Sequence, residues 1–472
     1  MKKNIRKIVS VILFLALLFF LMGRLYKIVS WKDTTGEYYS SIEQLKNTGD
    51  NLIDVVFVGT SHVYCGIYPS VMWEEHGISA FNMSVSGQDR YSAYHDMQEL
   101  VKTQSPKAVF VDLYFLSFTE GIEGNVHRNM LCLPTSTNSY GLLKDYFGTE
   151  DEESRKKVKD YVLRWPVVHT RHRELGKYDY LHFEENDYFR GEKIFYETSP
   201  VSLDEIRMGS DTVGELTDDE IELLDKFVKM SEDNGFTLYF TMLPCCVDES
   251  AQQKINAAEV YAREKGIEFL DFRRGGLLEL DPNTDFIDNA HLNAKGAVKL
   301  SSYLGNYASM NVELEDHRGD ENYHIWDEDA RYHYRSDFVN HLSTAGSLDE
   351  FAELASGSSG YTYIISREFT YDESKKDYAN ALELIGMAES DFAEGGTWIY
   401  KEGSLSKLFV NDSGEEVQYP LSKYDVLSLR FNGDYQQENV MIGKEDYSNK
   451  GFYLGITVYD NELERVALFK GF

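Results

Sequence analysis

The chain has 472 residues, enough for two domains, and a formal net charge of −32. Such a chain repels phosphate backbones, which excludes nucleic-acid binding as a function class. Aromatic residues make up 14% of the chain, which excludes a disordered acidic polymer. The four cysteines are too few for a disulfide scaffold, and their spacing is not that of metal ligands: Cys65, Cys132, Cys245 and Cys246.

The amino terminus resembles a membrane-targeting segment. Lys2, Lys3, Arg6 and Lys7 precede an apolar run at residues 8–22. A signal peptide and a short membrane span share this pattern, but no small-x-small cleavage site follows the run. We therefore predict an uncleaved membrane anchor at residues 1–32, with the bulk of the chain outside the cytoplasm.

A repeated strand–helix pattern follows a polar spacer. The pattern predicts a parallel sheet with right-handed crossovers, in a three-layer α/β/α domain of flavodoxin-like type at residues 33–310. The expected strands are 54–58, 80–85, 107–115, 236–243 and 267–272, and the expected helices are 70–76, 90–103, 217–233, 250–265 and 294–307.

The pattern is interrupted by an insertion at residues 117–211, which is rich in aromatic and basic side chains. Long insertions at strand ends are commonly lids or substrate platforms. His169 and His172 have a spacing that metal ligands use, but no cysteines or clustered carboxylates complete a set, so a solvated or structural role is favoured. No residue of the chain calls for a metal or cofactor.

Composition changes again towards the carboxyl end. Residues 311–345 are highly charged with little apolar periodicity, which predicts a linker. Residues 346–472 predict a smaller β-rich α+β domain, within the usual size range. Its expected strands are 361–365, 397–400, 426–430 and 452–459, with a helix at 374–385 that Ser374 caps.

Ser61 is a candidate nucleophile. It stands in the sequence Gly-Thr-Ser-His directly after the first expected strand and before a helix. This geometry places a side chain at the carboxyl end of a sheet, where open α/β folds carry their sites. The alternative is that the hydroxyl only caps the helix or forms the turn.

Asp288 and His291 form the second candidate group, on a loop that enters the last helix of the α/β domain. A carboxylate three residues before a histidine can accept a hydrogen bond from the imidazole and fix its tautomer. Because this loop follows the last strand, we expect it at the same sheet edge as Ser61. Alone, the pair is more typical of a helix cap beside a surface histidine.

These blocks resemble the SGNH (GDSL-like) hydrolase superfamily over about residues 51–310. The resemblance implies that Ser61 is the nucleophile, His291 the general base and Asp288 its orienting acid. It further implies an oxyanion hole made by the backbone N–H groups of Ser61 and Gly87. The usual Asp of the first block is Thr60 here, and the third-block Asn that donates to the oxyanion is absent. An inactive pseudoenzyme is therefore one alternative.

Two segments, 165–176 and 288–297, resemble more narrowly the membrane-anchored DltD-like and alginate-acetylation-like proteins that modify cell-surface polymers. This narrower likeness implies a polysaccharide substrate and a partner of the membrane-bound O-acyltransferase type. The end of the chain, residues 451–465, is similar to the interleukin-like EMT inducer domain. That likeness implies a binding module, for which Trp398 would serve either as a glycan-stacking platform or as a core residue.

The sequence thus predicts an extracytoplasmic O-acyl (acetyl) transferase or esterase that uses a Ser-His-Asp triad. The alternative is a non-catalytic surface protein that binds glycans or scaffolds an export complex. The distance between Ser61 and His291 discriminates between the two, because a triad needs hydrogen-bond reach.

Overall fold

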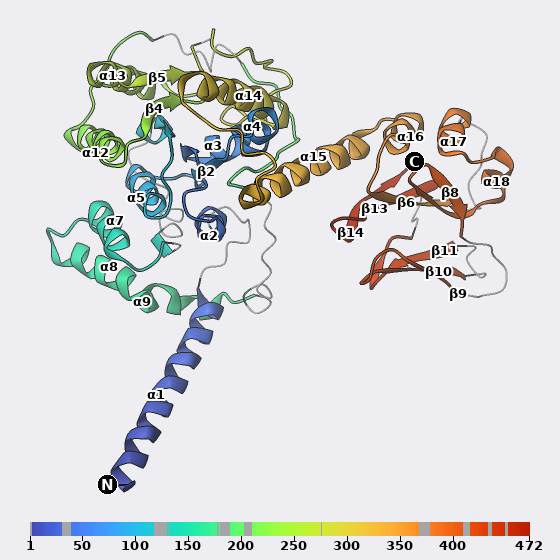
Figure 1. Ribbon diagram of the computed structural model, residues 1–472, viewed down its shortest axis with the longest axis horizontal. Helices are drawn as coiled ribbons and strands as arrows, with labels where there is room; N and C mark the ends of the chain where they lie inside the picture. The colour runs from blue at the N-terminus through green and yellow to red at the C-terminus, as the bar shows by residue number, and fades with distance from the viewer. Residues whose placement is uncertain are drawn as a thin grey trace. The chain divides into compact units, whose positions relative to one another are not determined.

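The computed structural model describes residues 2–30, 39–117, 130–131, 133–176, 179, 189–202, 210–274, 276–367, 378–408, 416–432, 437–448 and 452–472. The chain forms two compact units, Met1–His333 and Tyr334–Phe472 (Figure 1).

The first unit is built on a five-stranded parallel sheet with the strand order β2-β1-β3-β4-β5. This order is that of flavodoxin-like folds and confirms the expected α/β class. The strands are β1 (Val55–Gly59), β2 (Ala80–Ser84), β3 (Ala108–Asp112), β4 (Thr237–Met242) and β5 (Glu268–Asp271). The third strand is shorter than predicted, because the chain turns at Asp112 into the 3-10 helix η1 (Leu113–Ser117).

Helices cover both faces of this sheet, because side chains of a strand point alternately to opposite faces. Val56 and Val58 of β1 pack in one apolar cluster with α2, α5, α12 and α13, whereas Val55 and Phe57 pack in another with α3, α4 and α14. The helices are α2 (Tyr39–Asn47), α3 (Ser61–Gly66), α4 (Pro69–His76), α5 (Arg90–Leu100), α12 (Asp218–Asn234), α13 (Glu249–Lys265) and α14 (Ala294–Asn311). The expected three-layer arrangement is therefore present.

The amino-terminal segment forms the helix α1 (Lys2–Val29). Its portion Lys7–Val29 is long and apolar enough to cross a membrane, with a mean hydropathy of 2.6, and it is the one such helix in the described part of the chain. A signal sequence has the same properties, so the helix alone does not decide between an anchor and a leader.

The insertion contributes α7 (Thr137–Phe147), α8 (Glu152–Leu163), α9 (Trp165–Val168) and η2 (His169–Arg173). Helix α7 packs on α5, and α8 packs in turn on α7. The returning segment 189–201 lies beside the α/β core, where Glu192 accepts hydrogen bonds from the backbone and hydroxyl of Ser70. This returning segment contacts the start of α14, directly after the loop of His291, since Ala294 N donates to Phe195 O at 2.7 Å.

The expected linker at 311–345 holds the 21-residue helix α15 (His324–Thr344). The first half of this helix packs into the first unit, and the boundary between the two units falls within the helix, after His333. Trp326 is 1% exposed and donates through its indole N–H to Ala80 O at 2.9 Å, while His333 Nδ1 lies 2.8 Å from Glu192 Oε1. The buried face consists of aromatic, small and histidine side chains, so its apolar periodicity is weak.

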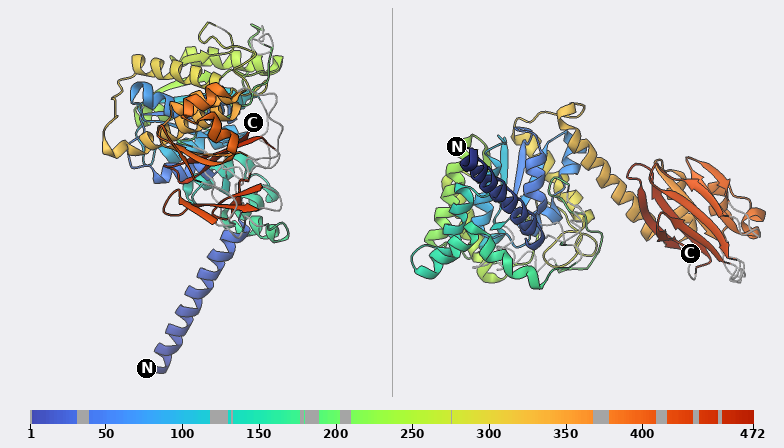
Figure 2. Two further views of the ribbon diagram at one scale, coloured as in Figure 1. Left: turned by 90° about the vertical axis from the view of Figure 1, so that its right-hand side faces the viewer. Right: turned by 90° about the horizontal axis from the view of Figure 1, so that it is seen from below.

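The second unit has two antiparallel sheets, with the orders β14-β13-β6-β7-β8 and β12-β11-β10-β9 (Figure 2). The strands are β6 (Tyr361–Arg367), β7 (Gly396–Lys401), β8 (Ser404–Lys407), β9 (Glu416–Pro420), β10 (Val426–Asn432), β11 (Gln437–Ile442), β12 (Glu445–Asp446), β13 (Leu454–Asp460) and β14 (Arg465–Gly471). The helices are α16 (Leu348–Ser356), α17 (Ala379–Ile385) and α18 (Glu389–Glu394). This β-rich α+β composition agrees with the prediction, although Ser374, the expected cap, lies outside the described residues.

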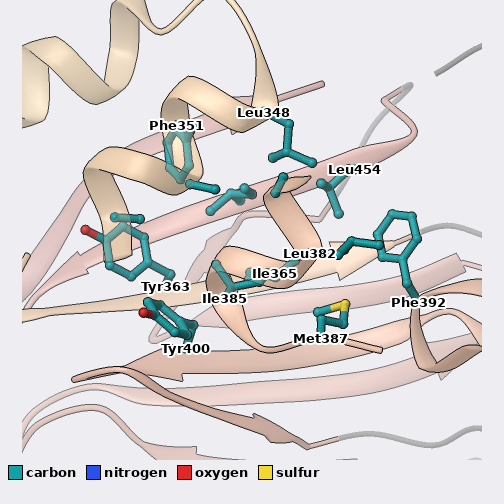
Figure 3. Close-up of a pocket in the computed structure, with 14 residues that line it drawn as sticks. Leu348, Phe351, Tyr363, Ile365, Leu382, Ile385, Met387, Phe392, Tyr400 and Leu454 are labelled. Atoms are coloured by element: carbon teal, nitrogen blue, oxygen red, sulfur yellow. The ribbon is translucent and has the colours of Figure 1, made fainter. Parts of the chain in front are cut away.

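The core of this unit lies between α16, α17 and the five-stranded sheet (Figure 3). Phe351, Leu382 and Leu454 line a cavity of about 20 Å³ there, which has room for about one water molecule and is a packing void. Trp398 belongs to the same core and is 1% exposed. The glycan-stacking alternative for Trp398 is therefore wrong, and the residue packs the interior.

Candidate active site

Ser61 stands at the junction of β1 and α3. The strand ends at Gly59, Thr60 is the N-cap of the helix, and Ser61 is the first helical residue. The Thr60 hydroxyl accepts a hydrogen bond from His62 N at 3.4 Å, so the capping role belongs to Thr60 and not to Ser61. The Ser61 side chain is partly exposed, as a nucleophile must be.

The three predicted site residues lie together. Ser61 Oγ is 2.7 Å from His291 Nε2, although the two residues are 230 positions apart in the sequence. His291 Nδ1 is 3.0 and 3.1 Å from the two carboxylate oxygens of Asp288. Because a carboxylate only accepts hydrogen bonds, Nδ1 carries the proton and Nε2 is left to accept from the Ser61 hydroxyl.

Asp288 is held in its charged form by its own loop. Burial alone would raise the pKa of this carboxyl group, but the backbone N–H of Ala290 and the imidazole of His291 lower the pKa below its usual value. Asp288 Oδ1 accepts from Ala290 N at 2.7 Å and from His291 N at 2.9 Å. The carboxylate therefore fixes both the backbone of the loop and the imidazole ring.

The loop that carries this pair is fixed at both ends. Ile287 N donates to His291 O at 3.0 Å, and Cys246 N, after β4, donates to Asn289 O at 2.8 Å. Asn293 then caps α14 by accepting from Lys295 N and Gly296 N. A rigid loop of this kind orients His291 before any substrate binds.

Gly87 lies in a turn at the end of the neighbouring strand β2. Gln88 N donates to Val85 O at 3.1 Å across this turn, and Val85 N donates to Gly59 O at 3.2 Å, which links the turn to the end of β1. Gly87 has a φ of 57°, a left-handed conformation that glycine adopts readily. Its N–H does not make the turn's own hydrogen bond, and the N–H of Ser61, as the first residue of a helix, has no acceptor within the helix.

Sequence reasoning missed a buried polar cluster that includes His62, the residue after Ser61. It consists of His62, Asp112 and Arg273, which are 4%, 1% and 1% exposed. His62 Nδ1 is 3.9 Å from Asp112 Oδ2, and Asp112 Oδ1 accepts from Leu243 N at 3.0 Å. The available signal was position, because Asp112 ends β3 and Arg273 follows β5, at the same sheet edge as Ser61.

Burial shifts the pKa values in this cluster. Burial raises the pKa of Asp112 to about 7. The Leu243 N–H and the Arg273 guanidinium lower the pKa of this carboxyl group, but by less than burial raises it. Burial also lowers the pKa of His62 well below its usual value, as do the charges of His291 and Arg273. The ring beside the candidate base is therefore neutral.

Asp112→Asn should change how stability depends on pH. The pKa of Asp112 is raised in the fold, so between pH 4 and 7 the unfolded chain ionises this group while the folded chain keeps it protonated. The parent therefore loses about 1.4 kcal/mol of unfolding free energy per pH unit over that window, and nothing further above pH 7. Since asparagine does not ionise, thermal unfolding curves should show the variant gaining stability relative to the parent from pH 4 to 7.

The exposed cap residue Asp248 offers a matched control for that comparison. Asp248→Asn makes the same chemical change and keeps an equivalent helix cap, so its pH profile shows how much of the effect comes from the substitution itself. If the profile of Asp112→Asn runs parallel to that of the parent, Asp112 is ionised in the fold and is balanced by Arg273, contrary to the prediction.

Among the described residues, no group of three or more His, Cys, Asp or Glu side chains is arranged to hold a metal ion. The insertion residues His169 and His172 instead turn their Nδ1 atoms to backbone carbonyls, at 2.9 Å from Pro166 O and 2.7 Å from His169 O. Both histidines are exposed, and these contacts are to carbonyl groups of their own turns.

No family model and no curated protein matches the chain. Among solved structures, it is similar to a Bacteroides fragilis protein described provisionally as an acylhydrolase, at 11% identity and a TM-score of 0.28, over 59% of this chain and 99% of that one. It is also similar to an acetyl xylan esterase, at 15% identity and a TM-score of 0.19, over 54% of this chain and 99% of that one. A gut microbial diltiazem-metabolizing enzyme shares 14% identity at a TM-score of 0.20, over 56% of this chain and 47% of that one. Scores this low support no conclusion about activity.

Proposed function

We propose that the chain is a membrane-anchored, serine-dependent acyl-transfer enzyme, an O-acetyltransferase or esterase, that acts outside the cytoplasm. The observation that carries this proposal is the 2.7 Å contact between Ser61 Oγ and His291 Nε2. The other ring nitrogen, His291 Nδ1, contacts the carboxylate of Asp288. A hydroxyl, a base and an orienting acid in hydrogen-bond reach are the working parts of nucleophilic acyl transfer.

In the proposed reaction, Ser61 Oγ attacks the acyl carbonyl carbon and its proton passes to His291 Nε2. Asp288 stabilises the imidazolium that results. The backbone N–H groups of Ser61 and Gly87 donate to the oxyanion of the tetrahedral intermediate. When that intermediate collapses, the leaving oxygen takes the proton from His291, and the acyl group remains as an ester on Ser61.

The second half of the reaction reverses these roles. A sugar hydroxyl or a water molecule gives its proton to His291 and attacks the carbonyl carbon of the ester. As the bond from that carbon to Ser61 Oγ breaks, the serine oxygen takes the proton from His291, which restores both residues. We propose that the acceptor is a cell-surface polysaccharide and that a partner protein, a membrane-bound O-acyltransferase, delivers the acyl group across the membrane. Both rest on the resemblance of segments 165–176 and 288–297 to polymer-modifying proteins.

Retention of α1 as an anchor is part of the proposal. Its last turn is integrated into the first unit, since Val29 is 7% exposed and Arg171 Nη1 donates to Val29 O at 3.2 Å. A leader that is removed after export has no need of such contacts with the mature protein.

Incubation with an activated acetyl ester tests the proposed function. The intact mass of the full-length protein should rise by one acetyl group, and peptide mapping should locate the ester on Ser61. An acetyl group found only on lysines or on other serines would contradict the proposal and favour the non-catalytic alternative.

A further inference from the structure

Helix α9 lies against the carboxyl-terminal end of α1 (Figure 1), and the 3-10 helix η2 contacts the same end. The ring of Trp165, the first residue of α9, meets that of Tyr26 edge to face with 6.0 Å between centroids. Arg171 of η2 donates to the carbonyl oxygens of Val29 and Ser30, and its Nη2 pairs with Asp179 Oδ1 at 3.0 Å. These contacts hold α9 and η2 beside the end of α1. A membrane span that ends at Val29 leaves the hydrocarbon layer of the bilayer at this point.

The side chains exposed at the junction of α8 and α9 are apolar and aromatic. Val162 and Leu163, at the end of α8, are 39% and 54% exposed, and Trp165 is partly exposed. Exposed aliphatic residues beside a tryptophan at the end of a membrane span are typical of the membrane–water interface, where the indole ring favours the headgroup level.

The charge of the segment is opposite to that of the whole chain. Residues 162–173 contain three arginines and two histidines but no aspartate or glutamate, although the chain has a net charge of −32. Arg164 and Arg171 bind backbone carbonyl oxygens, and Arg171 also pairs with Asp179, so the exposed basic side chains of the segment are His169, His172 and Arg173. Basic side chains next to a membrane span attract anionic lipid headgroups, whose phosphates guanidinium groups bind well.

We propose that residues 162–173 form an interfacial platform, a surface that lies in the headgroup layer of the membrane crossed by α1 and binds anionic phospholipids. This inference rests on the anchor part of the proposed function and is independent of the catalytic part. The platform would fix the height of the α/β domain above the bilayer, because Arg171 and Trp165 attach it to the last turn of α1.

Quenching of tryptophan fluorescence by brominated lipids tests the platform. The full-length protein is reconstituted in nanodiscs of phosphatidylglycerol or phosphatidylcholine, each brominated high in the acyl chain. The other four tryptophans, Trp31, Trp73, Trp326 and Trp398, are present in both the parent and Trp165→Phe, so the difference between the two proteins isolates the emission of Trp165. We expect that component to be quenched about twofold more in phosphatidylglycerol discs, because the anionic headgroups hold the platform down.

Two charge reversals sharpen the test. Arg173→Glu should reduce the quenching in phosphatidylglycerol discs to the level in phosphatidylcholine. Lys229→Glu, on an exposed side chain of α12, makes the same change in net charge and should leave the quenching as in the parent. Added inorganic phosphate should leave it unchanged too, because the site takes a lipid surface and not a free anion.

Several results would overturn the platform. Equal quenching in the two lipids removes the role of anionic headgroups, and loss of quenching with inorganic phosphate indicates a free-anion site. Absence of quenching in both discs removes the membrane contact and leaves this surface for a protein partner. Ser61→Ala should show the same quenching as the parent, because the platform does not depend on catalysis, so failure of the catalytic proposal would leave this test unchanged. Failure of the anchor proposal is recognised separately, because a chain that lacks α1 would not be incorporated into the discs at all.

Discussion

Ser61→Ala should lower the rate of acyl-enzyme formation and ester turnover by about 10⁵–10⁶-fold, the scale on which serine nucleophiles fail when removed. The variant keeps the imidazole and Asp288 but has no oxygen at 2.7 Å from His291 Nε2 to attack the acyl carbon. Its fold should be unchanged, because alanine is a good helix former and the N-cap of α3 is Thr60. The measurement is the rate of acetyl transfer to the protein by intact mass, beside the thermal unfolding curve.

Ser105→Ala is the matched control for this variant. Its exposed hydroxyl donates to Asn51 Oδ1 at 2.8 Å and has no imidazole beside it, so the rate should equal that of the parent. Acetylation of Ser61→Ala at the parent rate would assign the chemistry to another residue or to the solvent.

Most of the α/β domain could be predicted from the sequence because its local signals agree with each other. Apolar strands, the capping box of Thr217 and Glu220, and the stop at Gly235 all indicate the same element boundaries. Parallel strands then place every strand end at one edge of the sheet. For that reason, the juxtaposition of Ser61 and His291 followed from the order of the elements, without knowledge of any distance.

The parts that were missed are those in which tertiary contacts decide the structure. Helix α15 buries Trp326, Ala330 and His333, a face whose apolar period is interrupted by a histidine that pairs with Glu192. Strand β8 has a single apolar residue, Leu405, and β9 alternates Val417 and Tyr419 with exposed residues over only five positions, a signal too short to stand out in the sequence. Likewise, no local pattern shows that Asp112 is buried, because its neighbours His62 and Arg273 come from distant parts of the chain.

The buried cluster also bears on the missing oxyanion donor of the third block. The strand that would carry it ends at Asp112, and Tyr114, two residues on, packs its ring 3.9 Å from that of His62. The residues after β3 therefore pack against the turn that carries Ser61. The proposed oxyanion hole, made by the backbone N–H groups of Ser61 and Gly87, accordingly has no counterpart of the third-block Asn at the end of β3.

Asp288→Asn should slow acyl-enzyme formation by about 10³–10⁴-fold at neutral pH, through the tautomer of His291. In the variant, the amide oxygen can keep the two bonds that Asp288 Oδ1 accepts, from Ala290 N and His291 N. The amide nitrogen then takes the place of Oδ2, 3.1 Å from His291 Nδ1, and presents a donor to it. The imidazole must accept at Nδ1 and carry its proton on Nε2, so it no longer accepts the proton of Ser61.

Asp281→Asn separates this effect from a general disturbance of the loop. Asp281 also stabilises its loop, because its carboxylate accepts a hydrogen bond from Asn283 N at 2.9 Å. Since Asp281 contacts no histidine in the described structure, Asp281→Asn should acylate at the rate of the parent. Since Asp288 is half exposed, the expected loss lies below that for Ser61→Ala, and the two rates are compared in the same intact-mass assay. If Asp288→Asn and Asp281→Asn slow acylation equally, Asp288 only holds the loop, and the imidazole takes its tautomer from some other contact.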